Sequence, residues 1–288
     1  MTSIKPFGPN CTLGEGPLWH PLIERLFWFD IPRGDLHSSD SLGGQIKSWN
    51  FGEPASAAGW IDEDTLLVAT ATGLQKFDLT LGTWEKVCAL EEDNIATRSN
   101  DGRIGPDGSF WIGTMARDGS PHLGGYYRYV NGSIETLQER ISIPNATCFS
   151  PDGKVAYYAD TRKQVIWQWP LDAQGNPIGD KEIHINMRDD NINPDGAVCD
   201  AEGYLWNAQW GASRIVRYDP DGRLDKSIEL PVSQPTCPAF GGPDLKTLFI
   251  TSASDGLSDS QLQLQPNAGK TLMFSVDIPG IAENRANV

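Results

Sequence analysis

The sequence lacks the features that would place it in a membrane or an oxidising compartment. No stretch of the 288 residues approaches the run of about 18 apolar residues that a membrane-spanning helix needs. The amino-terminal segment MTSIKPFGPN has no apolar run of signal-peptide length. The five cysteines are widely spaced and form no CxxC pair, which is typical of buried, reduced thiols. We therefore expect a cytoplasmic protein.

Basic residues are in short supply. The chain has 23 Lys and Arg against 38 Asp and Glu, which gives a net charge of −15. A field of this sign repels phosphate backbones and anionic lipid headgroups, so nucleic-acid and membrane partners are not expected. An acidic chain can also hold cations, although a solvated surface accounts for most of such an excess.

Several catalytic motifs are missing as well. The four histidines show neither an HExxH motif nor any other paired spacing, which argues against a histidine-based zinc site. No GxSxG nucleophile elbow and no EF-hand loop can be found. The segment 267–271 ends like a phosphate-binding P-loop, but Leu264 stands where that motif requires glycine. Serine hydrolase, EF-hand and nucleotide-binding chemistry are therefore not expected.

A repeated unit is what the sequence does contain. Six short runs of β-branched and aromatic residues each follow a turn rich in Gly, Asp or Asn. The third residues of the runs are separated by 40, 44, 46, 49 and 43 residues. The runs are ERLFWFD (24–30), DTLLVAT (64–70), GSFWIGT (108–114), KVAYYAD (154–160), GYLWNAQ (203–209) and KTLFITS (246–252).

This period predicts an all-β, six-bladed β-propeller that spans residues 1–288 as a single domain. A further strand can be read after most runs, for example at 73–79, 124–130 and 214–220. Four strands fit into about 45 residues, which is the length of one propeller blade. No window shows a sustained helical period, so no helix is expected. One or two β-sandwiches are the alternative.

The ten tryptophans are interpreted as blade core, with Trp60 and Trp210 as alternative candidates for the channel mouth.

Polar side chains recur at one register in front of these runs. Glu15, Asn100, Asn145 and Asp195 lie 11, 10, 11 and 10 residues ahead of the third residue of their runs. Equivalent positions of different blades converge at the mouth of a propeller channel, so we expect these side chains to meet. Glu15, Asn145 and Asp195 offer hard oxygen ligands suited to Ca²⁺, Mg²⁺, Mn²⁺ or Fe²⁺ and able to accept Zn²⁺.

The alternative is that these residues only form turns. Pro-Asp-Gly, which contains Asp195, also occurs at 106–108, 151–153 and 220–222, where it is interpreted as a turn. The shared register across four blades is the observation that favours a site.

The sequence resembles the senescence-marker-protein/gluconolactonase family, which includes regucalcin and bacterial sugar lactonases. The resemblance extends over nearly the whole chain. One departure is Ala146, where family members commonly have glycine. The motifs that carry the resemblance are Leu13-Gly-Glu-Gly-Pro-Leu-Trp19, Arg98-Ser-Asn-Asp-Gly102 with Gly113-Thr-Met115, Asn145 with Ser150-Pro-Asp-Gly153, and Pro194-Asp-Gly196 with Gly203-Tyr-Leu-Trp206.

This resemblance implies a six-bladed propeller with one divalent metal ion in its channel. The family's metal ligands match Glu15, Asn145 and Asp195, and its substrate-binding positions match Arg98 and Asn100. The implied reaction is hydrolysis of a sugar lactone to an aldonic acid in carbohydrate catabolism, with Asp195 as the general base. The implied partner is a small-molecule lactone, and the protein is expected to be a monomer or weak dimer.

Other functions stay open at this point. A regucalcin-like Ca²⁺-binding regulator without turnover, an interaction platform and a lactonase of broader ester range share the predicted fold. The sequence does not choose between glucono-, galactono-, xylono- and arabinono-lactones. We expect that choice to depend on loops at the channel mouth, such as 116–124 and 253–268.

Overall fold

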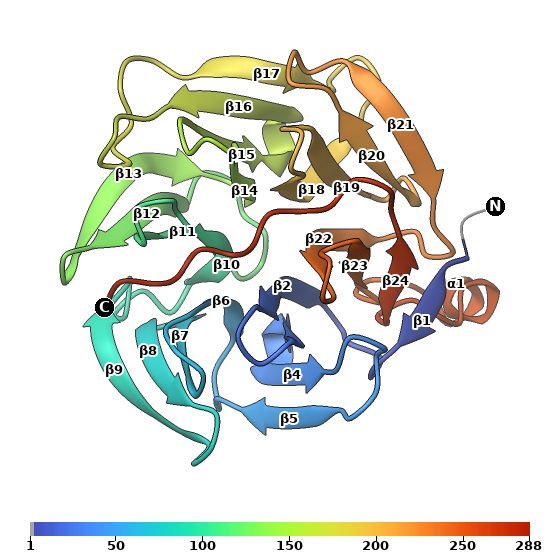
Figure 1. The fold of residues 1–288 in the computed structure, drawn as a ribbon, viewed down its shortest axis with the longest axis horizontal. Coiled ribbons are helices and arrows are strands. Elements are labelled where there is room, and N and C mark those ends of the chain that lie inside the picture. The colour runs from blue at the N-terminus through green and yellow to red at the C-terminus, as the bar shows by residue number, and fades with distance from the viewer. Residues whose placement is uncertain (1–2) are drawn as a thin grey trace.

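The computed structural model describes residues 3–288, which form six four-stranded antiparallel sheets around a central axis (Figure 1). The predicted six-bladed β-propeller is therefore confirmed. In five blades the strands follow chain order from the axis outward. In the sixth blade the outermost strand is β1 (Lys5–Phe7), which pairs with β24 (Thr271–Ser275) and so closes the ring.

The remaining strands are as follows. Blade 1 contains β2 (Gly14–His20), β3 (Arg25–Asp30), β4 (Asp35–Ser39) and β5 (Lys47–Asn50), and blade 2 contains β6 (Ala55–Trp60), β7 (Thr65–Thr70), β8 (Gly73–Asp78) and β9 (Thr83–Ala89). Blade 3 contains β10 (Thr97–Ile104), β11 (Phe110–Ala116), β12 (Gly124–Val130) and β13 (Ser133–Ile141), and blade 4 contains β14 (Pro144–Phe149), β15 (Val155–Asp160), β16 (Val165–Pro170) and β17 (Glu182–Asn186). Blade 5 contains β18 (Asn193–Cys199), β19 (Leu205–Trp210), β20 (Arg214–Tyr218) and β21 (Leu224–Glu229), and blade 6 adds β22 (Pro235–Gly241) and β23 (Thr247–Ser252).

Burial falls from the axis to the rim of each blade. All seven residues of β2 are buried, whereas β5 of the same blade contains no buried residue. The six apolar runs of the sequence form the second strands, which are covered on both faces by neighbouring blades. A strand buried on both faces gives a continuous apolar run, and for this reason the second strands carry the clearest sequence signal.

The hydrophobic core lies between the blades. It divides into six clusters, and each cluster joins two neighbouring blades. Between blades 1 and 2, for example, Phe29 and Leu36 pack with Val68 and Phe77. Between blades 6 and 1, Trp19 stacks on Phe249 with ring centroids 5.9 Å apart. The ring is thus held by apolar contacts at every blade boundary.

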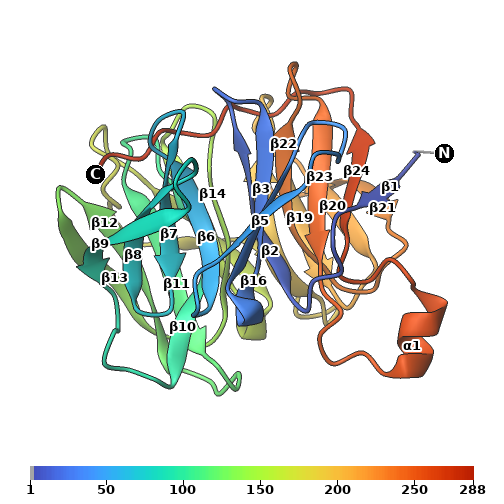
Figure 2. The ribbon, with the colours of Figure 1, turned by 90° about the horizontal axis from the view of Figure 1, so that it is seen from below.

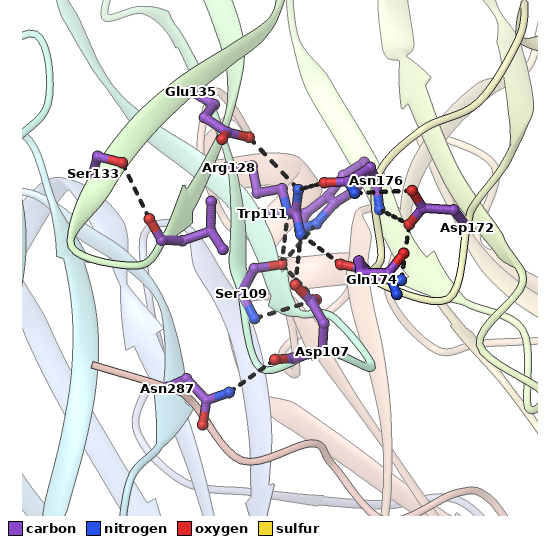
Figure 3. A network of polar contacts seen from close by, with 11 residues as sticks. Asp107, Ser109, Trp111, Arg128, Ser133, Glu135, Asp172, Gln174, Asn176 and Asn287 are labelled. Carbon is purple, nitrogen blue, oxygen red and sulfur yellow. Dashed lines mark hydrogen bonds and ion pairs between the residues drawn. The ribbon is translucent and has the colours of Figure 1, made fainter.

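A polar network adds to the apolar contact between blades 3 and 4. The buried guanidinium of Arg128 in β12 pairs with Asp107 at 2.6 Å and donates to Ser109 Oγ at 3.0 Å (Figure 3). It also donates to Asn176 Oδ1 at 2.6 Å and to the Gln174 carbonyl at 2.9 Å, both in the loop after β16. One side chain therefore fastens the turn before β11 to a loop of the next blade.

The expectation of no helix is corrected by α1 (Asp259–Leu264) and by two 3-10 turns, η1 (Ile31–Arg33) and η2 (Thr161–Lys163). The helix α1 begins with a capping box in which Ser258 and Gln261 hydrogen-bond each other's backbone N–H. Six residues are too few for a helical period, and none of them is buried, so the sequence shows no apolar period for this helix.

No helix in the described part of the chain is both long and apolar enough to cross a bilayer.

The carboxyl-terminal segment crosses the face of the propeller where the innermost strands end (Figure 1). The Glu283 carbonyl accepts a hydrogen bond from Trp60 Nε1 at the end of β6, at 2.9 Å, and Asn284 Nδ2 donates to the Ile104 carbonyl at the end of β10, at 3.1 Å. The Glu283 carboxylate forms a buried ion pair with Arg103. The helix α1 projects from the opposite face (Figure 2).

We predict that Glu283→Gln destabilises the protein by about 3 kcal/mol, because it leaves the Arg103 guanidinium buried without its counter-charge. The matched control is Glu92→Gln, which breaks an exposed ion pair with Lys86 and is expected to cost less than about 1 kcal/mol. Urea unfolding followed by tryptophan fluorescence measures both values. Equal losses in the two variants would contradict the assigned role of the segment.

Candidate active site

Every innermost strand is interrupted at an equivalent place. The pairing between the first and second strands of each blade shifts register after the first, second or third residue of the first strand. Such a bulge turns a side chain away from the regular alternation of the strand. One buried polar residue from each of the six interruptions belongs to a set here named the polar ring: Glu15, Ser56, Asn100, Asn145, Asp195 and Thr236.

Local backbone geometry next to two members of the polar ring, Glu15 and Asn145, fits their crowded positions. Next to Glu15, Gly16 has a φ of 56°, and a Cβ there would lie 2.1 Å from the Ser56 carbonyl oxygen. Only glycine satisfies both the left-handed conformation and the close approach. Ala146, next to Asn145, also has a positive φ of 57°. A left-handed alanine costs about 1–2 kcal/mol, which explains physically why glycine suits this position.

Four members of the polar ring, all except Ser56 and Thr236, line a cavity of about 370 Å³ at the face where the innermost strands begin. This volume lies within the range of about 300–1,000 Å³ that small-molecule sites occupy. All five residues predicted for the site line the cavity: Glu15, Arg98, Asn100, Asn145 and Asp195. The structure brings them together from blades 1, 3, 4 and 5, while their roles stay predictions.

A chain of hydrogen bonds fixes the amide of Asn145. Asn100 Nδ2 donates to Asn145 Oδ1 at 3.0 Å and to the Pro144 carbonyl at 2.9 Å. Asn145 Nδ2 donates to Thr161 Oγ1 at 2.8 Å. One lone pair of Asn145 Oδ1 is left for a ligand, because the other accepts from Asn100. The amide oxygen is therefore held in one orientation before any ligand binds.

Arg98 is the first residue in this series of hydrogen bonds. Its Nη1 donates to Asn100 Oδ1 and to the Ser99 carbonyl, each at 2.8 Å. Its Nε and Nη2 have no hydrogen-bond partner within residues 3–288, and Arg98 lines the cavity. Burial lowers the pKa of Arg98 to about 10, so the side chain stays charged at neutral pH. Arg98 thus presents three N–H donors to a ligand.

Two carboxylates meet at the inner end of the cavity. Glu15 Oε2 accepts from the Gly16 N–H at 2.8 Å, and the Asp195 carboxyl group lies within the electrostatic influence of Glu15. Burial, reinforced by the charge of Asp101, raises the pKa of Glu15 to about 8. Burial and then the charge of Glu15 raise the pKa of Asp195 well above its usual value. Both carboxylates are therefore short of compensating positive charge.

The residues present fit a divalent cation. Neither Glu15 nor Asp195 forms an ion pair with a Lys, Arg or His side chain of residues 3–288. Two buried carboxylates and one fixed amide oxygen are the hard donors that Ca²⁺ and Mg²⁺ prefer. The described residues contain no group of three or more His, Cys, Asp or Glu that could hold a metal, so an amide has to supply the third ligand.

The sequence places Glu15, Asn145 and Asp195 in front of the apolar runs, at the channel mouth. In the structure each of them lies inside an innermost strand, at the register shift. Asp195 in particular belongs to β18, whereas the Pro-Asp-Gly segments at 106–108, 151–153 and 220–222 form turns as expected.

Several residues of the polar ring and of the cavity lining were missed by sequence reasoning. Ser56 and Thr236 occupy the same register, 10 and 12 residues ahead of Leu66 and Leu248, so the spacing could have found them. Thr161 carries no comparable signal, because it comes from η2. Of the two tryptophans considered for the mouth, Trp210 lines the cavity, whereas Trp60 lies at the opposite face against the carboxyl-terminal segment.

Comparison with known proteins gives one consistent result. The model of the SMP-30/Gluconolactonase/LRE-like region matches residues 13–254. The chain is 33% identical to a 6-deoxy-6-sulfogluconolactonase of Pseudomonas putida over 94% of each chain. It is 34% identical to an L-arabinolactonase of Azospirillum brasilense, over 95% of this chain and 92% of that protein. The crystal structure of a calcium-binding protein, regucalcin, from Agrobacterium tumefaciens superposes with a TM-score of 0.95 at 37% identity, covering 97% of this chain and 95% of that one.

We predict that Ca²⁺ or Mn²⁺ raises the melting temperature of the chelator-treated protein by about 5 °C or more. A ligand at one hundred times its Kd stabilises the fold by about 2.7 kcal/mol, which corresponds to a shift of this size in a chain of this length. Asp195→Asn removes one charged ligand and is expected to abolish most of the shift.

The matched control is Asp152→Asn, because Asp152 lies in an identical Pro-Asp-Gly tripeptide on an exposed turn. It should keep the wild-type shift in differential scanning calorimetry. A full shift in Asp195→Asn would show that the cation binds elsewhere.

Proposed function

Since the chain belongs to the SMP-30/gluconolactonase family, we propose that it hydrolyses a sugar lactone to the aldonic acid, with a divalent cation at Glu15, Asn145 and Asp195. One observation carries this proposal. The three oxygen donors come from three blades, are all buried, and share one cavity with the unpaired donors of Arg98. Relatives whose names describe lactone hydrolysis support the reaction class.

The two carboxylates and the amide hold the cation and limit where a lactone can lie. When bound, a divalent cation supplies charge that polarises the lactone carbonyl and makes water more acidic. Glu15 contributes charge from one side of the site and Asn145 a neutral oxygen from another. The lactone carbonyl is then expected to face the inner end of the cavity.

Asp195 is the proposed general base. A carboxylate oxygen of Asp195 takes a proton from the attacking water while the water oxygen bonds to the carbonyl carbon. The bond between that carbon and the ring oxygen then breaks, and the ring oxygen receives the proton as a hydroxyl. Water is thereby added across one C–O bond, with no other reactant required.

Arg98 is the proposed donor to the substrate. Its Nε–H and Nη2–H groups can hydrogen-bond the developing oxyanion or a sugar hydroxyl. Asn100, for which the family resemblance implies substrate binding, lines the cavity, and both hydrogens of its Nδ2 are donated to Pro144 and Asn145. We therefore infer that Asn100 is a positioning residue that holds Asn145 and Arg98 in register.

We also infer a cytoplasmic location. All five cysteines are free thiols, as expected of a compartment that keeps cysteine reduced. The proposed partner is a small-molecule lactone, and a monomer or weak dimer stays a prediction.

A second candidate function is Ca²⁺ binding without turnover. The structural neighbour described as a calcium-binding protein favours it. It requires the same ligands but makes no use of the unpaired donors of Arg98, so the lactone hydrolase is preferred.

We predict that the metal-loaded protein hydrolyses five- or six-membered aldonolactones in a pH-stat assay, after subtraction of spontaneous hydrolysis. Chelation should abolish the activity, and a divalent cation should restore it. Asp195→Asn is expected to lower kcat by about 10²–10⁴-fold, the usual effect of losing a general base. Asp152→Asn should retain wild-type activity.

Near-full activity in Asp195→Asn with metal bound would exclude Asp195 as the base. Metal binding without turnover of any lactone would favour the regulatory candidate.

A further inference from the structure

Three arginines surround the cavity mouth on the side of blades 3 and 4. Arg98 and Arg117 line the cavity, and Arg162 reaches the mouth by donating from Nη2 to the Gly119 carbonyl at 2.6 Å. None of the three forms an ion pair with a carboxylate of residues 3–288. In a chain with a net charge of −15, a group of unpaired guanidiniums at the mouth of the cavity favours the binding of an anionic ligand.

Arg117 is held in a way that leaves its charged end available. It follows directly after β11, and its Nε donates to the Thr97 carbonyl at 3.0 Å. Its two Nη nitrogens donate no hydrogen bond to residues 3–288. A guanidinium anchored through Nε presents its terminal nitrogens as a planar fork, and this geometry matches carboxylate, sulfonate and phosphate oxygens.

Two carboxylates share the mouth. Asp118 belongs to the exposed turn after β11, where its Oδ1 accepts from the Ser120 N–H at 2.9 Å. Asp255 comes from blade 6, after β23. Neither lies within ion-pair distance of a guanidinium of the three arginines. Blades 3 and 4 therefore contribute three positive groups against one negative group, and the opposite rim contributes Asp255.

This distribution of charged groups favours one orientation of the substrate in the cavity. With a divalent cation bound, the charges of Glu15 and Asp195 at the inner end are balanced, whereas the guanidinium of Arg117 at the mouth is not, so an anionic group is attracted to the mouth. If the lactone carbonyl faces the inner end, as the proposed function requires, the far end of the sugar faces Arg117.

We propose that the site prefers a sugar lactone with an anionic group at the end remote from the ring carbonyl, and that Arg117 binds this group. The inference rests on the proposed lactonase function and adds the substrate class. Carboxylate, sulfonate and phosphate share the chemistry that Arg117 recognises.

The test compares two matched pairs of substrates on the metal-loaded, full-length protein at low salt. One pair is glucono-1,5-lactone and 6-phosphoglucono-1,5-lactone, and the other is glucono-1,4-lactone and glucaro-1,4-lactone. In the wild type, kcat/KM for at least one anionic member should exceed that for its neutral partner about tenfold, chiefly through a lower KM. The pair with the larger ratio identifies phosphate or carboxylate as the preferred anion.

Arg117→Gln should lower this ratio about tenfold, the effect expected for one charge-assisted hydrogen bond. Arg117→Lys should keep part of the preference, because it retains the charge without the fork. Added salt should shrink the wild-type preference. Arg285→Gln is the matched control: Arg285 is exposed and anchored by Nε to the Ile61 carbonyl at 2.6 Å, but lies in the segment on the opposite face. It should keep the wild-type ratio.

Equal kcat/KM for neutral and anionic members of both pairs would overturn the inference, as would equal ratios in Arg117→Gln and Arg285→Gln. In either case hydrolysis of the neutral lactones leaves the proposed function standing. Absence of turnover with all four lactones would overturn the proposed function and, with it, this inference.

Discussion

The register shift in the first strand of every blade is the constraint that joins the fold to the site. Regular pairing would send alternate side chains into the cores between blades, where carboxylates and amides have no partners. At the shift, one polar side chain of each blade turns to the axis instead, as Glu15, Asn145 and Asp195 do. The shift requires a left-handed backbone beside the polar residue, which Gly16 adopts freely and Ala146 adopts with strain. Apolar contacts at six blade boundaries offset this strain.

The repeated blade could be predicted because its second strand is buried on both faces and leaves a continuous apolar run. The outer strands are half exposed, so their pattern is weak. The helix α1 and the carboxyl-terminal segment could not be predicted for a different reason. Neither repeats from blade to blade, and the segment holds its place through single contacts such as Arg103 with Glu283, which join residues 180 positions apart.

Much of the candidate site was within reach of the sequence, since the spacing of Glu15, Asn100, Asn145 and Asp195 follows the blade period. The directions and hydrogen bonds of the side chains could not be predicted from the sequence. The sequence does not reveal that Asn100 has donated both amide hydrogens, or that Arg98 keeps three donors free. Of the loops expected to set specificity, 116–124 contributes Arg117 and 253–268 contributes Asp255 to the mouth. Loop conformation depends on long-range contacts, such as that between Arg117 and Thr97, that spacing does not encode.

The closure of blade 6 bears on how the protein is made. Residues 5–7 form the outer edge of a sheet whose other three strands lie between residues 235 and 275. During synthesis, blades 1 to 5 can assemble in order as they leave the ribosome, but β1 has no partner until β24 has been made. Until then its edge and the open flank of blade 1, including Trp19, are exposed to other chains. The nascent ring is therefore most vulnerable to misassembly just before its last blade is complete.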